Sequence, residues 1–147
     1  MTIRIVETVF DPFLEIQHFQ TQLALNGKCG ATSIFIGTMR DFNDGDDVRA
    51  MTLEHYDGMT QKQLAKIIAT AKEKWAILDE LIIHRIGDIL PNEPIVVISV
   101  WAMHRAEAFE ACRYIMEELK SHAPFWKREI LTSNESRWVL KNTSGKN

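Results

Sequence analysis

Residues 81–102 read LIIHRIGDILPNEPIVVISVWA, and this stretch decides the fold class. It contains two β-like runs, Leu81–Ile86 and Pro94–Ala102, separated by the segment GDILPNE. The glycine and proline of that segment favour a turn between paired strands, so the two runs are expected to be hairpin-like neighbours in one sheet.

Apolar side chains recur at helical spacing in three other stretches, which predicts three helices. The first begins at the cap Asp11 with Pro12 in its first turn and continues to about Leu23. The second covers Met59–Trp75, and the third runs from about His104 to Ser121, before Pro124. Further strands are predicted at Ala31–Gly37, Val48–Tyr56 and Phe125–Leu131.

The resulting order, αββαββαβ, predicts an α+β sandwich with a mixed, mainly antiparallel sheet and packed helices. A length of 147 residues with 46% apolar residues predicts one domain over residues 1–147. The acidic, turn-rich stretch DFNDGDD at Asp41–Asp47 predicts a mobile loop, and the polar stretch KNTSGKN at residues 141–147 predicts a frayed tail.

Composition argues against several classes of protein and site. The sequence shows neither an apolar run of about 18 residues nor a secretory signal, so we expect a cytoplasmic protein without a membrane span. A formal net charge of -3 argues against a nucleic-acid binder. Cys29 and Cys112 lack a CxxC partner or a nearby histidine group, so no metal site or disulfide is predicted.

Positive charge is nevertheless concentrated locally, which predicts a site for one specific anion. In FIGTMRD, residues 35–41, a strand delivers Arg40 into a loop where it could hold a phosphate, or it could be a solvated loop arginine. In HRAEAF, residues 104–109, His104 and Arg105 stand at a helix start, whose free N–H groups favour anions; a merely surface-exposed pair is the alternative.

The segment LKSHAPFWKRE, residues 119–129, carries two lysines around a proline-and-aromatic corner. If Lys120 and Lys127 lie close together, each raises the cost of charging the other, so the pKa of one could fall far enough for acid–base work. The alternative for Lys120 is a favourable interaction with the C-terminal end of a helix dipole. The pair His84 and Arg85 is interpreted as strand-end residues, not as a second anion site.

The motifs FIGTMRD, LEHYDGM, IIHRIGDI, HRAEAF, LKSHAPFWKRE and RWV, spread over Phe35–Val139, resemble those of the large, catalytic subunit family of molybdopterin synthase. The resemblance implies a sulfurtransferase that converts cyclic pyranopterin monophosphate into the dithiolene of molybdopterin. Sulfur would come from the C-terminal thiocarboxylate of a small ubiquitin-like carrier subunit, and no cofactor is implied. A noncatalytic scaffold that binds the carrier is the alternative.

The resemblance also implies roles for individual residues. Arg40, His104 and Arg105 would hold the phosphate and pterin. Lys120 would lie against the carrier's terminal carbonyl, polarising it or accepting the acyl group, and Lys127 would transfer protons or stabilise negative charge. The residues implied to line or support the site are Thr38, Met39, Arg40, His104, Arg105, Lys120, Lys127, Arg128 and Glu129.

Helix geometry adds an expectation about assembly. Arg105 and Lys120 stand 15 residues apart on one predicted helix, which separates their backbones by roughly 22 Å. One chain could hardly wrap both around one small phosphate, so we expect either that they serve different ends of the substrate or that the pocket is shared across a symmetric dimer, and we favour the dimer. The resemblance likewise implies a central homodimer within a heterotetramer, with one carrier on each outer side.

Overall fold

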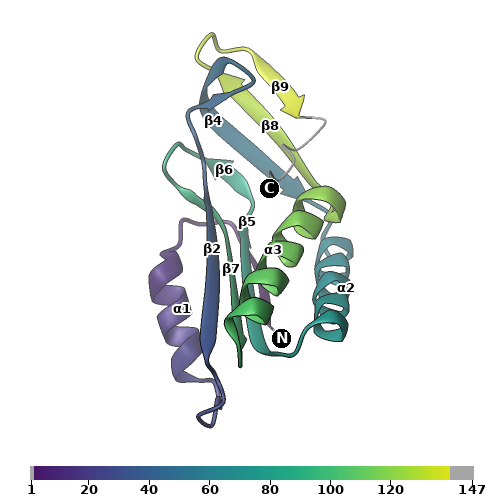
Figure 1. The fold of residues 1–147 in the computed structure, drawn as a ribbon. Helices are drawn as coiled ribbons and strands as arrows, with labels where there is room; N and C mark the ends of the chain where they lie inside the picture. The colour runs from purple at the N-terminus through teal and green to yellow at the C-terminus, as the bar shows by residue number, and fades with distance from the viewer. Residues whose placement is uncertain (1, 140–147) are drawn as a thin grey trace.

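The computed structural model describes residues 2–139, which form two β-sheets and three helices (Figure 1). The predicted tail at residues 141–147 lies outside this range. The elements, in chain order, are β1 (Thr2–Val6), α1 (Pro12–Thr21), β2 (Ala31–Thr38), β3 (Phe42–Asn43), β4 (Asp46–His55), α2 (Met59–Lys74), β5 (Ile77–Arg85), β6 (Gly87–Ile89), β7 (Pro94–Ala102), α3 (Arg105–His122), β8 (Phe125–Leu131) and β9 (Ser136–Val139).

The first sheet has the strand order β1-β5-β7-β2 and is built on the hairpin-like pair expected from residues 81–102. Strands β5 and β7 pair antiparallel, with Ile82 opposite Ile98, and β2 pairs antiparallel with the other edge of β7. Strand β1 pairs parallel with β5, which makes the sheet mixed.

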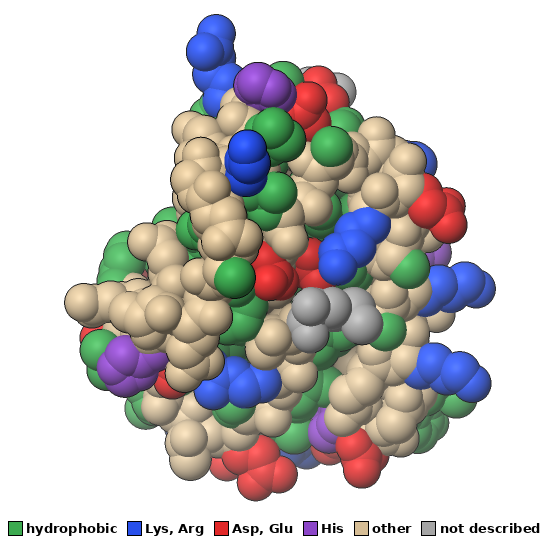
Figure 2. Space-filling model, turned by 90° about the horizontal axis from the view of Figure 1, so that it is seen from below, with side chains coloured by type: hydrophobic (Ala, Val, Ile, Leu, Met, Phe, Trp, Pro, Cys, Tyr) green, Lys and Arg blue, Asp and Glu red, His purple; other side chains and the backbone are tan. Residues whose placement is uncertain are grey.

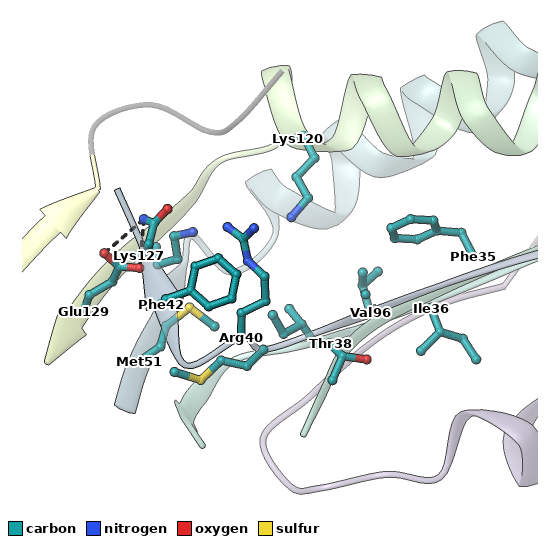
Figure 3. Close-up of a pocket in the computed structure, with 14 residues that line it drawn as sticks. Phe35, Ile36, Thr38, Arg40, Phe42, Met51, Val96, Lys120, Lys127 and Glu129 are labelled. Atoms are coloured by element: carbon teal, nitrogen blue, oxygen red, sulfur yellow. Dashed lines mark hydrogen bonds between the residues drawn. The ribbon is translucent and has the colours of Figure 1, made fainter. Parts of the chain in front are cut away.

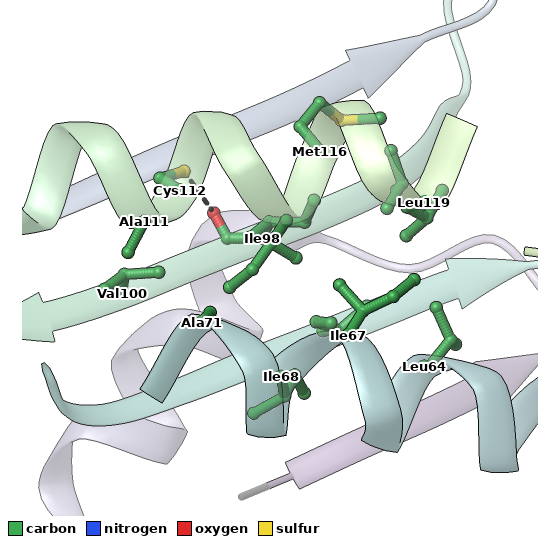
Figure 4. Close-up of a cluster of buried hydrophobic side chains, with 13 residues drawn as sticks. Leu64, Ile67, Ile68, Ala71, Ile98, Val100, Ala111, Cys112, Met116 and Leu119 are labelled. Atoms are coloured by element: carbon green, nitrogen blue, oxygen red, sulfur yellow. Dashed lines mark hydrogen bonds between the residues drawn. The ribbon is translucent and has the colours of Figure 1, made fainter. Parts of the chain in front are cut away.

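Helices cover both faces of this sheet, with α1 on one face and α2 and α3 on the other (Figure 1). Successive strand residues point to opposite faces, so β7 supplies Ile98 and Val100 to the core beneath α2 and α3 and supplies Val97 and Trp101 to the core beneath α1. Figure 4 shows the larger core, in which the Cys112 thiol lies 3.8 Å from the carbonyl oxygen of Ile98.

The second sheet has the order β3-β4-β8-β9, with the short strand β6 also paired to β4. A small separate core of Met39, Val48, Met51, Leu53 and Ile89 supports it. Strand β8 follows α3 after a short corner, so the C-terminal end of α3 and the start of the second sheet are placed together (Figure 1).

The predicted α+β class with mainly antiparallel pairing is confirmed, and three features are additional. The pattern did not reveal β1, β3, β6 or β9, and the strands divide between two sheets. The stretch Asp41–Asp47, predicted as a loop, contains the β3–β4 hairpin. Asp44 and Gly45 form its tip with φ values of 50° and 82°, the left-handed conformation that an Asp-Gly hairpin turn requires. Its mobility stays a prediction.

Positive and negative side chains are interspersed over the face that Figure 2 shows, and neither sign forms a broad patch there. Within residues 2–139, none of the helices is long and apolar enough to cross a membrane. The same residues contain no group of three or more side chains placed to hold a metal ion.

Candidate active site

Arg40, Lys120 and Lys127 converge on one cavity of about 360 Å³ at the junction of the two sheets and α3 (Figure 3). The side chains of Arg40 and Lys120 extend toward one another across it. Two of the three cationic segments, FIGTMRD and LKSHAPFWKRE, therefore meet at this cavity, and the third, HRAEAF, does not line it. The cavity is lined by Phe35, Ile36, Gly37, Thr38, Met39, Arg40, Phe42, Asn43, Met51, Ile95, Val96, Lys120, Lys127 and Glu129.

The end of β2 is fixed so that Arg40 reaches the cavity. Met39 is 5% exposed and belongs to the second core, and its backbone exchanges hydrogen bonds with the turn before β7, donating to the carbonyl of Glu93 and accepting from the amide of Asn92. At Gly37 an added Cβ would lie 2.9 Å from Cγ1 of Val96, so only glycine fits without a shift. Arg40 also lies over the ring of Phe42, 4.7 Å from its centroid.

Both lysines have a lowered pKa, where the sequence had predicted it for one. Burial lowers the pKa of Lys120, and the positive charges of Lys127 and Arg40 lower it further. Burial likewise lowers the pKa of Lys127; Glu129 opposes this effect and Arg40 adds to it. Each side chain therefore carries a neutral amine at lower pH than an exposed lysine would.

Glu129 lines the cavity, but its carboxylate is held by neighbouring side chains. It is 4% exposed and accepts hydrogen bonds from Nδ2 of Asn43 at 3.0 and 3.1 Å and from Nε of Arg137 at 3.1 Å. Arg137 also pairs with Asp46 at 2.8 Å. These contacts fasten the β3–β4 hairpin to β8 and β9, so Glu129 supports the cavity wall.

Sequence reasoning missed Asn43, Phe42 and Arg137. Asn43 and Phe42 belong to the acidic stretch that was read as a mobile loop, and nothing in its composition indicates an inward-facing side chain. Arg137 begins the motif RWV, which belongs to the family resemblance and by itself indicates no contact for the arginine. Its contact with Glu129 depends on the antiparallel register of β8 and β9, where the two residues are directly opposite.

Of the nine residues implied for the site, three do not line this cavity. Arg128 lies between Lys127 and Glu129 on β8, and because alternate strand residues face opposite sides, its guanidinium lies over the ring of Trp138, at 5.8 Å. His104 and Arg105 are exposed at the N-terminal end of α3, whose 18 residues span about 27 Å. Lys120 is on the last turn, so the expected separation is present, and the shared pocket stays a prediction.

The arrangement is suited to binding an anion and moving protons. Three cationic side chains and one engaged carboxylate line a cavity that also has apolar walls of phenylalanine, isoleucine, valine and methionine. None of the described lining residues is a cysteine or a serine, so the cavity provides amines but no thiol nucleophile of its own.

Comparison with known proteins gives consistent matches. The family model described as MoaE protein matches residues 11–122. A molybdopterin synthase catalytic subunit from Ralstonia nicotianae is 49% identical over 138 residues, covering 94% of this chain and 76% of the relative. The protein of the same name from Pseudomonas aeruginosa is 47% identical over 139 residues, covering 95% and 90%.

Solved structures agree with these relatives. A molybdopterin biosynthesis MoaE protein from Burkholderia ambifaria superposes with a TM-score of 0.79 at 43% identity, covering 97% of this chain and 92% of that one. A molybdopterin synthase structure from Staphylococcus aureus gives a TM-score of 0.81 at 31% identity, covering 92% and 95%. The similarity therefore extends over both sheets and all three described helices.

Proposed function

This chain belongs to the MoaE protein family, and on that premise we propose that it is the catalytic subunit of a molybdopterin synthase. It converts cyclic pyranopterin monophosphate into molybdopterin by forming the dithiolene. The sulfur comes from the C-terminal thiocarboxylate of a small ubiquitin-like carrier subunit. The observation that carries the proposal is the convergence of Arg40, Lys120 and Lys127 on one cavity.

The side chains that line the cavity indicate which chemical groups this chain supplies and which the carrier supplies. The thiocarboxylate brings the sulfur nucleophile, so the chain itself needs no reactive cysteine. It must hold two anions, the substrate phosphate and the carrier's terminus, close together, and cationic side chains offset their repulsion. Arg40 binds the phosphate, with Thr38 and Met39 shaping the wall beside it.

The two lysines take the proton and acyl steps. Lys120 contacts the carrier's terminal carbonyl and either polarises it or accepts the acyl group through its amine. Lys127 exchanges protons with the reacting groups or stabilises negative charge as it develops. Lowered pKa values support these roles, because an acid–base group works best when its pKa is near the working pH.

The lysine environment also favours an enzyme over a noncatalytic scaffold. Burying two amines beside an arginine disfavours their charged forms, which costs folding stability. A surface that only held a carrier tail would gain nothing from this cost. A catalytic site gains amines that titrate closer to neutral pH.

The proposed assembly is a cytoplasmic heterotetramer built on a central homodimer, with one carrier subunit on each outer side. His104 and Arg105 of the partner subunit complete each cavity, because the same residues of one chain lie at the far end of α3 from Lys120. Glu129 fastens the hairpin wall, and Arg128 supports β8 from its opposite side.

A reconstituted reaction tests this function. The purified chain is incubated with thiocarboxylated carrier and the pterin precursor, and the dithiolene product is detected by mass. Lys120→Ala and Lys127→Ala should each abolish most conversion while the fold stays intact, and Lys66→Ala, which removes an exposed lysine on α2, should leave conversion unchanged. Near-normal conversion by either folded active-site variant contradicts the role given to that lysine.

A further inference from the structure

A second, smaller cavity of about 50 Å³ adjoins the first behind the two lysines. It shares Lys120 and Lys127 with the larger cavity, and its other walls are mainly aliphatic. Among the described residues that line it, His84 is the one polar side chain besides the lysines. The reaction proposed above gives His84 no role.

The His84 ring is held on two sides. It is 4% exposed, and its Nδ1 lies 2.8 Å from the carbonyl oxygen of Arg85. A carbonyl oxygen only accepts, so Nδ1 must carry the proton and Nε2 must carry the lone pair. The ring stacks on Phe125 with centroids 3.9 Å apart and an interplanar angle of 13°. His84 is thus a hydrogen-bond acceptor of fixed tautomer and orientation.

The His84 imidazole is neutral at neutral pH. Burial lowers its pKa to about 3; the bond to the carbonyl of Arg85 raises it in part, and the charges of Lys120 on α3 and His55 on β4 lower it. Lys127 on β8 faces the same cavity. A group with so low a pKa is a poor proton store at neutral pH, and a good neutral acceptor.

The cavity is large enough to connect this acceptor to the lysines through water. An enclosed water needs about 10–15 Å³ and two or more polar partners. The volume of about 50 Å³ meets the first requirement, and the three polar residues that line the cavity, His84, Lys120 and Lys127, can meet the second.

We propose that His84 is a positioning residue for Lys120, accepting at Nε2 a water-mediated hydrogen bond from the Lys120 amine and so orienting that amine toward the main cavity. This inference rests on the proposed function only in one respect, which is that the Lys120 amine contacts the carrier's terminal carbonyl in the main cavity. A neutral acceptor favours the ammonium form of its donor, so His84 opposes the effect of burial and limits how far the pKa of Lys120 falls.

Competitive labelling of lysines tests this inference without requiring turnover. The protein is acetylated with trace acetic anhydride at a series of pH values, and peptide mass spectrometry gives an apparent pKa for each lysine, with Lys66 as an exposed internal reference. His84→Phe and His84→Gln form a matched pair. Both lose the Nδ1 contact with Arg85, but only glutamine places an amide acceptor near the original Nε2.

His84→Phe should lower the apparent pKa of Lys120 by about 0.5–1 pH unit, a three- to tenfold rise in the amine-to-ammonium ratio at a given pH. His84→Gln should restore at least half of that change. A merely structural role would lower the melting temperature of both variants alike and leave Lys120 unmoved. An unchanged pKa in the folded phenylalanine variant, or equal shifts in both variants, overturns the proposal.

A second measurement leaves His84 intact, in case neither variant folds. Nitrogen-15 NMR of protein labelled at histidine reports the tautomer and the environment of Nε2, and the wild type is compared with Lys120→Met. We expect a protonated Nδ1 and an Nε2 resonance that moves when the lysine amine is removed. A chemical shift showing that Nε2 is protonated, or an Nε2 resonance that does not move in Lys120→Met, contradicts the inference, whatever the dithiolene assay shows.

Discussion

Removing the Asn43 side chain should loosen the cavity wall and reduce stability by an amount that the structure defines. The Asn43 amide donates to both oxygens of Glu129, which is 4% exposed and, among the described residues, keeps the hydrogen bond from Arg137 when the amide is lost. A hydrogen bond to a charged group contributes about 1.5–3 kcal/mol, so Asn43→Ala should lower the free energy of unfolding by about that much. Since 1 kcal/mol shifts Tm by about 2–4 °C in domains slightly larger than this one, Tm should fall by about 3–12 °C.

Urea unfolding at fixed protein concentration measures this effect, and two further variants sharpen it. Asn43→Asp keeps the size of the side chain but places a second carboxylate against Glu129, so it should be more destabilising than alanine at neutral pH and recover as the pH falls and a carboxyl is protonated. Asp47→Ala lies on the same hairpin and removes a side chain without a hydrogen bond among the described residues, so it should be nearly neutral. If Asn43→Ala unfolds like Asp47→Ala, the Glu129 contacts do not hold the wall.

Three other outcomes follow from the structure. The pKa of Lys120 is lower in the folded state than in the unfolded state, so between the two pKa values the unfolded wild type binds more protons and the free energy of unfolding rises with pH. Lys120→Met removes this titration and should flatten the rise, which urea unfolding from pH 7 to 10 would measure. Gly37→Ala should cost about 1–3 kcal/mol because the new Cβ meets Cγ1 of Val96 at 2.9 Å, and the double variant with Val96→Ala should lose less stability than the sum of the two single losses. Light scattering should give a mass near twice the 16.9 kDa of one chain; a monomer that is active with its carrier contradicts the shared pocket.

Sequence reasoning was most successful where one local signal decided the outcome. The apolar runs at residues 81–102 predicted antiparallel neighbours, and β5 and β7 are paired so. The cap at Asp11 predicted the start of α1, and its carboxylate accepts from the amides of Phe13 and Leu14. These features depend on residues close together in the chain, so the pattern contains them.

Features that depend on register between distant strands were not predictable in this way. Strand β1 is only five residues long and half-buried, and it is fixed by parallel pairing with β5, far along the chain. Within the motif WKRE, the alternation of β8 turns Arg128 away from the cavity while Lys127 and Glu129 line it. The sequence correctly predicted His84 at a strand end. It could not predict that the ring lines a cavity, because other walls of that cavity come from α3 and β8.

The charge balance of the main cavity explains why it should be completed by other molecules. Among its described lining residues, Arg40, Lys120 and Lys127 face a single carboxylate, Glu129, whose oxygens already accept from Asn43 and Arg137. The positive charges of Lys127 and Arg40 lower the pKa of Lys120 beyond the effect of burial, whereas for Lys127 the carboxylate of Glu129 raises the pKa against the effect of burial and Arg40 lowers it. An entering phosphate or carboxylate favours the ammonium forms and raises the pKa of both lysines, so binding of the substrate and the carrier's tail would itself bring protons to Lys120 and Lys127.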